Sequence, residues 1–355
     1  RGCANVIFGR SDAVGKLPVN LSPKYKAGHS IYKKKRTNPF DSSINSSYDL
    51  SNAWAVIDSA INDRIFPGAQ IFISKSGKII ASKSFGHHDY DQASNLVTNE
   101  SMYDIASLTK VVSITPVIMK LIAMKKIGLK HTLDQFYSNI DENKKDITIK
   151  HLLTHSSGLK PFVEYYKTNK KNRENIIADI LNVELDFNPG DEFQYSDLGM
   201  ILLMDIIEKV SGSSLDNLSN NWVYKKIGMN NTMFNPPSKL TKQIVPTEYD
   251  SLFRGKMVHG IVHDENAFLL EGVSGHAGLF STAQDIGNFS QMLLNEGVFL
   301  GRRYLKKNII KKFTKRLNEI EGSDRTIGWD TPSQNGRSSA GDYFSKNTYG
   351  HLGFT

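Results

Sequence analysis

The sequence lacks several features that would point directly to a class of protein. Its 355 residues include a single cysteine, Cys3, so an internal disulfide framework is excluded and the redox compartment stays open. The longest apolar run, residues 111–124, is too short to cross a bilayer and is interrupted by Lys120. No internal repeat is present. Length and apolar content fit a globular protein of one large domain or two ordinary ones.

Acidic residues are scarce only at the start of the chain. The formal net charge is +8, and residues 1–40 hold nine Lys or Arg against one acidic residue, a net of +8. The rest of the chain holds 35 residues of each sign and is neutral overall. The densest basic run, residues 33–36, is more typical of a solvated linker than of a nucleic-acid-binding surface. We therefore expect no nucleic-acid partner.

From residue 49 onward the pattern of apolar residues predicts regular structure. Residues 50–65 have helical spacing, and the apolar runs at 69–74 and 78–85, joined by turn residues, predict an antiparallel hairpin. Further helices are predicted from Ser107 onward and over residues 147–155, 198–211 and 283–295. Strands first, helices in the middle and strand-like sequence at the end favour an α+β fold.

The stretch Ser107-Leu108-Thr109-Lys110 is the first candidate site. At the start of a helix, Ser107 and Lys110 lie on the same face, one turn apart. A serine hydroxyl becomes an effective nucleophile when a nearby group takes its proton. The start of a helix also supplies unpaired N–H groups and a positive dipole end where an oxyanion would develop. Taken alone, this pattern is more typical of a helix start with a surface lysine than of a catalytic site.

Two later motifs favour the catalytic interpretation. Tyr195-Ser196-Asp197 stands in a short turn before a predicted helix, and Gly350-His351-Leu352-Gly353-Phe354 is a strand-like run near the end. With these motifs in this order, the chain resembles the serine β-lactamase and penicillin-binding-protein superfamily, on its class C and esterase-like side. The runs at 151–159 and 275–282 also look like this superfamily, and the resemblance covers roughly residues 45–355.

The resemblance implies a β-lactamase/transpeptidase-like α+β fold, with an antiparallel sheet flanked by helices and a mainly helical subdomain over residues 111–270. It implies an acyl-enzyme on a serine, an oxyanion held by main-chain N–H groups, and no metal or organic cofactor. Substrates would be D-alanyl peptides, β-lactams or small esters, and cell-wall fragments would fit a location in the cell envelope. The implied catalytic residues are Ser107, Lys110, Tyr195 and His351, supported by Asp197, Gly353 and Phe354.

Two positions depart from the pattern of the superfamily. Asp197 stands where Asn is usual, and a carboxylate within about 4 Å of Lys110 favours the ammonium form of the lysine. We therefore expect Tyr195 to take the proton from Ser107, because a neighbouring cation stabilises a phenolate. His351 stands where Lys is usual, and histidine is mostly neutral at pH 7. A fixed positive charge for a substrate carboxylate is then not expected, which leaves ester substrates open.

Structural interpretations of the same residues stay open. Tyr195 is compatible with a core aromatic residue, Asp197 with a helix cap, and His351 with a strand histidine that has no catalytic role. A second class of function is a non-catalytic module that binds peptides or glycans. The intact set of Ser107, Lys110 and Tyr195 argues against it, because binding alone would not require all three.

A cluster of histidines suggests a zinc site as a further alternative. His259 and His263 are four residues apart beside Asp264, and His276 follows downstream. They lack the H-E-x-x-H arrangement of a zinc-dependent hydrolase, so we do not expect a metal. The glycines at 272, 275 and 278 fit a loop near the active site better than a phosphate-binding loop.

The first thirty residues carry a separate, looser resemblance. Residues 5–9 and 15–19 look like the C-terminal end of a glycoside hydrolase family 3 protein, which implies an upstream glycosidase domain as a partner in a longer chain. Residues 31–48 would be a basic linker and residues 49–355 the serine hydrolase domain, truncated at its C-terminus. We expect such a fragment to be poorly soluble and nearly inactive, with apolar faces partly uncovered on the 49–63 and Ser107 helices.

Overall fold

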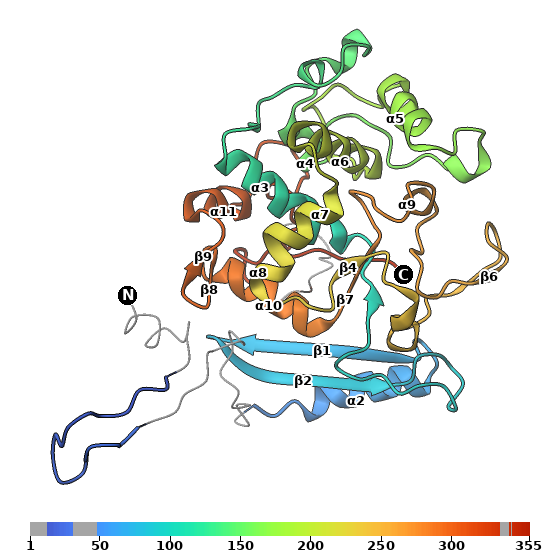
Figure 1. The fold of residues 1–355 in the computed structure, drawn as a ribbon. Coiled ribbons are helices and arrows are strands. Elements are labelled where there is room, and N and C mark those ends of the chain that lie inside the picture. The colour runs from blue at the N-terminus through green and yellow to red at the C-terminus, as the bar shows by residue number, and fades with distance from the viewer. Residues whose placement is uncertain (1–12, 31–47, 334–340, 342) are drawn as a thin grey trace.

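The computed structural model (Figure 1) describes residues 13–30, 48–333, 341 and 343–355. Nearly all of the predicted linker, residues 31–48, and the glycosidase-like motif at residues 5–9 lie outside these ranges. Within the described residues, the first helix begins at residue 51 and is followed by a hairpin, as the sequence predicts.

A two-stranded antiparallel sheet forms the base of the molecule in Figure 1. Strands β1 (Gly68–Lys75) and β2 (Lys78–Gly86) pair in the register Gly68↔Gly86, with a bulge after Ile73. Helix α2 (Ser51–Asn62) lies below this hairpin and α10 (Ala283–Leu294) above it. The ring of Phe72 rests on the backbone of Gly287, where a Cβ atom would lie 2.5 Å from it, so no larger residue fits there. The predicted hairpin and its helices are confirmed.

A second, smaller antiparallel sheet lies next to the Ser107 helix. Its strands, in the order β3-β7-β4, are β3 (Tyr103–Asp104), β7 (Leu279–Ser281) and β4 (Met233–Phe234). Strand β3 ends three residues before Ser107, and β7 follows the 275–278 run. This sheet therefore joins two segments whose paired residues are 176 and 178 positions apart in the sequence. The remaining strand pairs are β5 (Tyr249–Asp250) with β6 (Lys256–Met257) and β8 (Val298–Phe299) with β9 (Arg302–Arg303).

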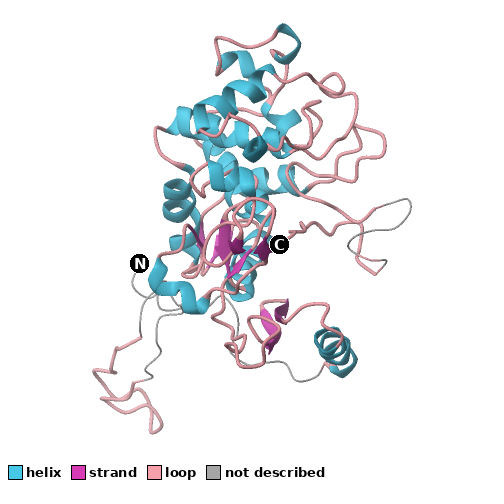
Figure 2. Cartoon of the chain, turned by 90° about the vertical axis from the view of Figure 1, so that its right-hand side faces the viewer, coloured by secondary structure: helices cyan, strands magenta, loops and turns pink. Residues whose placement is uncertain are grey.

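The helical part of the chain packs around α6 (Asp197–Ser211), in which ten of fifteen residues are buried. Figure 2 shows these helices gathered above the strands, with α2 on the other side. The other α-helices are α3 (Thr115–Ala123), α4 (Ile149–Leu153), α5 (Arg173–Asn182), α7 (Leu215–Ser219), α8 (Lys225–Ile227), α9 (Glu265–Leu269) and α11 (Lys307–Thr314). Two π-helical turns are η1 (Lys110–Ile114) and η5 (Asn220–Tyr224). The 3-10 turns are η2 (Leu133–Gln135), η3 (Glu142–Lys144), η4 (Tyr165–Lys167) and η6 (Ser238–Gln243).

Three expectations need correction. The helix predicted over residues 147–155 ends at Leu153, because His155 has φ +54° and cannot continue it. The predicted C-terminal strand reduces to one antiparallel bridge, Gly350 with Asp330, and residues 351–355 have no regular structure. Helix α2 has no buried residue, as expected, but the Ser107 helix is covered, with all five residues of η1 buried.

Within the described residues, none of the helices combines the length and apolar character needed to span a membrane.

Candidate active site

The turn that carries Ser107 follows directly after β3 and has a strained backbone. Ala106 has φ +45°, a conformation that residues other than glycine rarely adopt. The Asp104 side chain holds this turn: one oxygen accepts a hydrogen bond from the Ala106 N–H and the other from the His263 N–H, each at 2.8 Å. Ser107 therefore stands at a fixed position where the chain leaves the sheet and enters a helix.

Lys110 lies under Ser107 and is almost completely buried, with 1% of its side chain exposed. Its Nζ donates hydrogen bonds to Ser107 Oγ at 2.8 Å and to the main-chain oxygen of His276 at 3.0 Å. It also forms an ion pair with Asp197 Oδ1 at 2.8 Å. A buried ammonium requires a compensating charge of this kind.

Asp197 is positioned by the turn before α6. The Ser196 hydroxyl caps this helix by accepting a hydrogen bond from the Gly199 N–H at 3.3 Å, and it donates one to the Lys160 carbonyl at 2.7 Å. The interpretation of Asp197 as the helix cap is therefore wrong. Since Ser196 performs that role, the carboxylate of Asp197 is available for Lys110.

The half-buried ring of Tyr195 lies among cations and imidazoles. The Lys110 Nζ is 4.8 Å from the centroid of this ring, and the Arg325 guanidinium is 5.9 Å from it. The rings of His155 and His351 have their centroids 4.5 and 5.9 Å from that of Tyr195. Two positive charges therefore lie within 6 Å of the centre of this ring. This environment differs from that of an ordinary core aromatic residue.

His155 supports Tyr195 as a neutral imidazole. Burial, reinforced by the positive charges of Arg325 and Lys110, holds the pKa of His155 well below its usual value. Its Nδ1 accepts a hydrogen bond from the Ser196 N–H at 3.1 Å, so the remaining proton is on Nε2. This contact joins His155 to the turn that carries Tyr195 and Asp197.

His351 and the residues after it lie beside the Ser107 turn. The His351 Nδ1 is 2.6 Å from the Leu352 carbonyl, and burial lowers the pKa of His351 to about 4, so the ring is neutral at pH 7. Gly353 packs against the turn, where a Cβ atom would lie 2.8 Å from the main-chain oxygen of Ile105. Phe354 is 87% exposed.

The histidines that suggest zinc are not brought together. His259 Nε2 lies 2.8 Å from the main-chain oxygen of Ile244, and His263 Nε2 lies 2.7 Å from a carboxylate oxygen of Glu248. His276 instead joins a group with Asp197 and Asp264, whose ligand atoms lie within 4.8 Å of one another. Asp197 is already paired with Lys110, and Asp264 with His276, so these carboxylates have partners within the protein.

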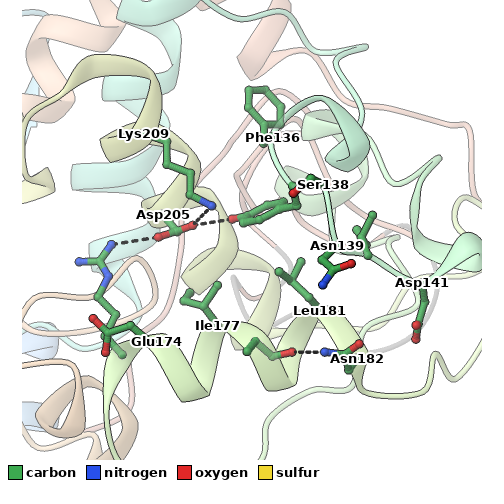
Figure 3. A pocket seen from close by; sticks show the side chains of 14 residues that line it. Phe136, Ser138, Asn139, Asp141, Glu174, Ile177, Leu181, Asn182, Asp205 and Lys209 are labelled. Carbon is green, nitrogen blue, oxygen red and sulfur yellow. Dashed lines mark hydrogen bonds and ion pairs between the residues drawn. The ribbon is translucent and has the colours of Figure 1, made fainter.

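A separate cleft of about 700 Å³ lies between residues 136–141 and the helices α5 and α6 (Figure 3). Its most buried charged group, Asp205, accepts a hydrogen bond from the Tyr137 hydroxyl at 2.8 Å and pairs with Lys209 at 2.9 Å and Arg173 at 3.3 Å. Asp205 is eight residues after Asp197 on α6, about 12 Å along the helix. The carboxylate serves the packing of this lobe and takes no part in the Ser107 site.

Sequence reasoning misses Arg325, and it considers His276 only as a metal ligand. Arg325 lies in an extended segment without a motif, and its guanidinium is paired with Asp330 while facing the rings of Phe193 and Tyr195. Burial lowers the pKa of Arg325, an effect that the charge of Asp330 opposes. The sequence Arg325-Thr326-Ile327-Gly328-Trp329 carries no signal of this position, because neither a motif nor a periodic pattern marks the arginine.

A serine paired with a buried lysine, beside a tyrosine and between an antiparallel sheet and a helical lobe, is the arrangement of a serine hydrolase of the β-lactamase type. The chain belongs to the Beta-lactamase family, whose family model matches residues 55–355. It is a β-lactamase/D-alanyl-D-alanine carboxypeptidase-like hydrolase, so the alternative of a non-catalytic binding module does not hold.

Two curated relatives are 30% identical to this chain. One is the N-acetylmuramyl-L-alanine amidase of Bacillus subtilis, aligned over 82% of this chain and 73% of the relative. The other is a putative D-alanyl-D-alanine carboxypeptidase of Escherichia coli, aligned over 97% of this chain and 83% of the relative. Because 97% coverage exceeds the span of residues 55–355, this second alignment extends into the segment before residue 55.

Solved structures share the fold. The octameric penicillin-binding protein homologue from Pyrococcus abyssi has a TM-score of 0.65 and 26% identity over 79% of this chain, which spans 65% of that protein. EstCE1, a hydrolase with promiscuous acyltransferase activity, has a TM-score of 0.62 and 21% identity, over 79% of this chain and 80% of the other. None of these four proteins is named a glycosidase, so the glycoside hydrolase family 3 resemblance of residues 1–30 gains no support and stays a prediction.

Proposed function

We propose that the chain hydrolyses small amide or ester carbonyls through an acyl-enzyme on Ser107, within a single hydrolase domain over residues 49–355. The observation that carries this proposal is the 2.8 Å contact between Ser107 Oγ and the buried Nζ of Lys110. D-alanyl peptides are the first substrate class to test, because relatives are named D-alanyl-D-alanine carboxypeptidases.

The environment of Lys110 favours Tyr195 as the general base. An ammonium that is paired with Asp197 has no lone pair with which to accept a proton, and it donates to Ser107 Oγ instead. The phenolate of Tyr195, stabilised by Lys110 and Arg325, takes the hydroxyl proton while Ser107 Oγ forms a bond to the carbonyl carbon.

In the remaining steps Tyr195 first gives its proton to the leaving group and then takes one from water. The tetrahedral intermediate expels its leaving group, which receives the proton held by Tyr195. Water then attacks the acyl-enzyme and gives a proton to the Tyr195 phenolate, and Ser107 recovers its proton as the acid is released. The main-chain N–H groups of Ser107 and Phe354 hold the oxyanion in both halves. The close packing of Gly353 on the Ser107 turn supports this role for its neighbour Phe354.

Neutral His351 favours small esters as a second substrate class. Because its Nδ1 faces the Leu352 carbonyl, Nδ1 carries the proton and Nε2 is an acceptor. The buried Nε2 has no hydrogen-bond partner among the described residues. His351 therefore offers an acceptor in place of a cation, and a free carboxylate on the substrate gains no ion pair from it.

Labelling with a fluorophosphonate tests the proposed function. The wild type should gain one adduct, and peptide mapping should locate it at Ser107. An adduct of undiminished yield in Ser107→Ala would refute the assignment. Rates with a D-alanyl-D-alanine peptide, a chromogenic cephalosporin and p-nitrophenyl acetate then rank the three substrate classes.

A further inference from the structure

A second buried ion pair lies next to Lys110, and the hydrolysis described above does not use it. His276 Nε2 is 2.7 Å from Asp264 Oδ1, and its Nδ1 is 2.7 Å from the Ser274 hydroxyl oxygen. His276 and Ser274 are 1% and 0% exposed. Since both ring nitrogens face an oxygen that can accept a hydrogen bond, the contacts fit an imidazolium, in which both nitrogens donate.

The charges around His276 agree with this assignment. Burial alone would lower the pKa of His276, but the charge and hydrogen bond of Asp264, aided by the charge of Asp197, raise it above its usual value. The positive charge of Lys110 opposes them. Burial would likewise raise the pKa of Asp264, yet the neighbouring His276 holds it well below its usual range. Both shifts favour the ionised form of the pair.

The main chain of His276 is fixed as firmly as its side chain. A Cβ atom on Gly275 would lie 2.0 Å from the main-chain oxygen of Met200 in α6, and one on Gly278 would lie 2.6 Å from the oxygen of Gly272. The backbone of this segment is thus pressed against its neighbours on both sides of His276. Its carbonyl, which accepts the hydrogen bond from Lys110 Nζ, has little freedom to move.

The four charged groups come from four different segments and alternate in sign. Asp264 precedes α9, His276 precedes β7, Asp197 begins α6 and Lys110 begins η1. Two carboxylates and two cations in contact add up to zero, so neither carboxylate is left uncompensated beside Ser107. Removing one member alone would leave a net charge at short range in a poorly solvated site.

We propose that His276, clamped by Asp264 and Ser274, is a positioning residue for the reaction at Ser107. It directs Lys110 through its own carbonyl, and as an imidazolium it cancels the second carboxylate beside the site. This inference rests on the proposed acyl-enzyme mechanism. It concerns how the site is charged and held, and it assigns His276 no contact with the substrate.

Charge balance distinguishes this role from a purely structural one. His276→Asn leaves Asp264 uncompensated, and a nearby negative charge makes every group at the site hold its proton more tightly. The group that must be deprotonated for acylation, whether Tyr195 or Lys110, then loses its proton at higher pH. In Asp264→Asn the histidine loses both its partner and its proton, so the net charge of the pair stays at zero. The double variant is neutral as well.

The experiment compares the wild type, His276→Asn, Asp264→Asn and the double variant. The second-order rate constant for fluorophosphonate labelling is measured for each from pH 5 to pH 9. The acidic limb is the part of the pH–rate profile in which the rate rises as the essential group loses its proton. In His276→Asn we expect this limb to move up by about one pH unit. At pH values below the limb, the rate should be roughly tenfold lower than in the wild type. Asp264→Asn and the double variant should keep the limb close to its wild-type position.

An unmoved limb in His276→Asn, or an equal shift in all three variants, overturns the inference. Should His276→Asn fail to fold, NMR of wild-type protein with nitrogen-15-labelled histidine decides the matter, because a neutral His276 ring at pH 7 contradicts the proposal. Absence of a Ser107-dependent adduct in the wild type refutes the proposed function itself. A wild type that labels normally alongside an unmoved limb refutes only the role of His276.

Discussion

Asp197 Oδ1 lies 2.8 Å from Lys110 Nζ, and this ion pair places a carboxylate in direct contact with the amine beside Ser107. In Asp197→Asn the shape is kept while the negative charge is lost. We expect the acidic limb of the pH–rate profile to move to lower pH, because proton loss at the site becomes easier. This is the opposite direction to His276→Asn. A limb that moves to higher pH would show that the ion pair does not control ionisation at the site.

The role of Tyr195 can be separated from that of Lys110. Tyr195→Phe keeps the ring between His155 and the cations and removes only the hydroxyl, so the fold should persist. Loss of a general base lowers rates by about 10²–10⁴-fold. Tyr103→Phe is a matched control, because the buried Tyr103 hydroxyl has no hydrogen-bond partner among the described residues. Near-normal turnover in Tyr195→Phe combined with an inactive Lys110→Ala would reverse the assignment.

His351 offers a test of substrate choice. His351→Lys introduces a cation where the wild-type ring is neutral, which favours acyl donors that carry a free carboxylate. We expect the ratio of kcat/KM for a D-alanyl-D-alanine peptide to that for p-nitrophenyl acetate to rise about tenfold, equivalent to about 1.4 kcal/mol. An unchanged ratio would mean that His351 does not face the leaving-group side of the substrate.

Gly275 is expected to tolerate no side chain. In Gly275→Ala the added Cβ would meet the main-chain oxygen of Met200 and force the 275–278 segment away from α6. Overpacking of this kind destabilises a protein by about 1–3 kcal/mol, and the carbonyl that binds Lys110 would move with the segment. Gly128→Ala is the control, since its nearest neighbour would lie at an ordinary 3.7 Å. Equal thermal stability of the two variants would contradict the prediction.

Asp285 makes stability depend on pH. Burial raises the pKa of Asp285 to about 6, against hydrogen bonds from Thr232 and from the Asn231 N–H. The folded protein therefore binds this proton more tightly than the unfolded chain, whose carboxyl has a pKa near 3.8. The free energy of unfolding should fall by about 2 kcal/mol from this group as pH rises from 4 to 6. Asp285→Asn should remove that part of the dependence in urea titrations, and identical slopes in both proteins would exclude it.

Local patterns predict much of this fold. The spacing of Ser107 and Lys110 and the alternation in β1 and β2 depend on residues a few positions apart, which the sequence displays directly. Helix ends are less certain, since Ser196 and Asp197 are both good capping residues and only packing decides between them. Helix α4 ends before His155 because this residue has a left-handed backbone conformation, which its residue type does not predict.

The parts of the site that escape prediction come from distant segments. Lys110 binds the carbonyl of His276, which lies 166 residues further along the chain. Such a contact cannot be predicted from residue type, because every residue has a main-chain carbonyl. Arg325 reaches Tyr195 from a segment without helical or alternating periodicity. The alternating charges of Asp264, His276, Asp197 and Lys110 exist only after three loops have folded against α6, so no sequence window contains them.

The strained backbone at Ala106 sets a limit on engineering this protein for heat resistance. Glycine adopts φ +45° at little cost, whereas alanine there carries a penalty of about 1–2 kcal/mol. Selection for thermal stability alone would favour Ala106→Gly. The same substitution would widen the range of backbone dihedral angles that residue 106 can adopt, directly before Ser107. A thermostable variant obtained in this way is expected to be a slower enzyme, so a productive screen should score retained turnover together with survival of heating.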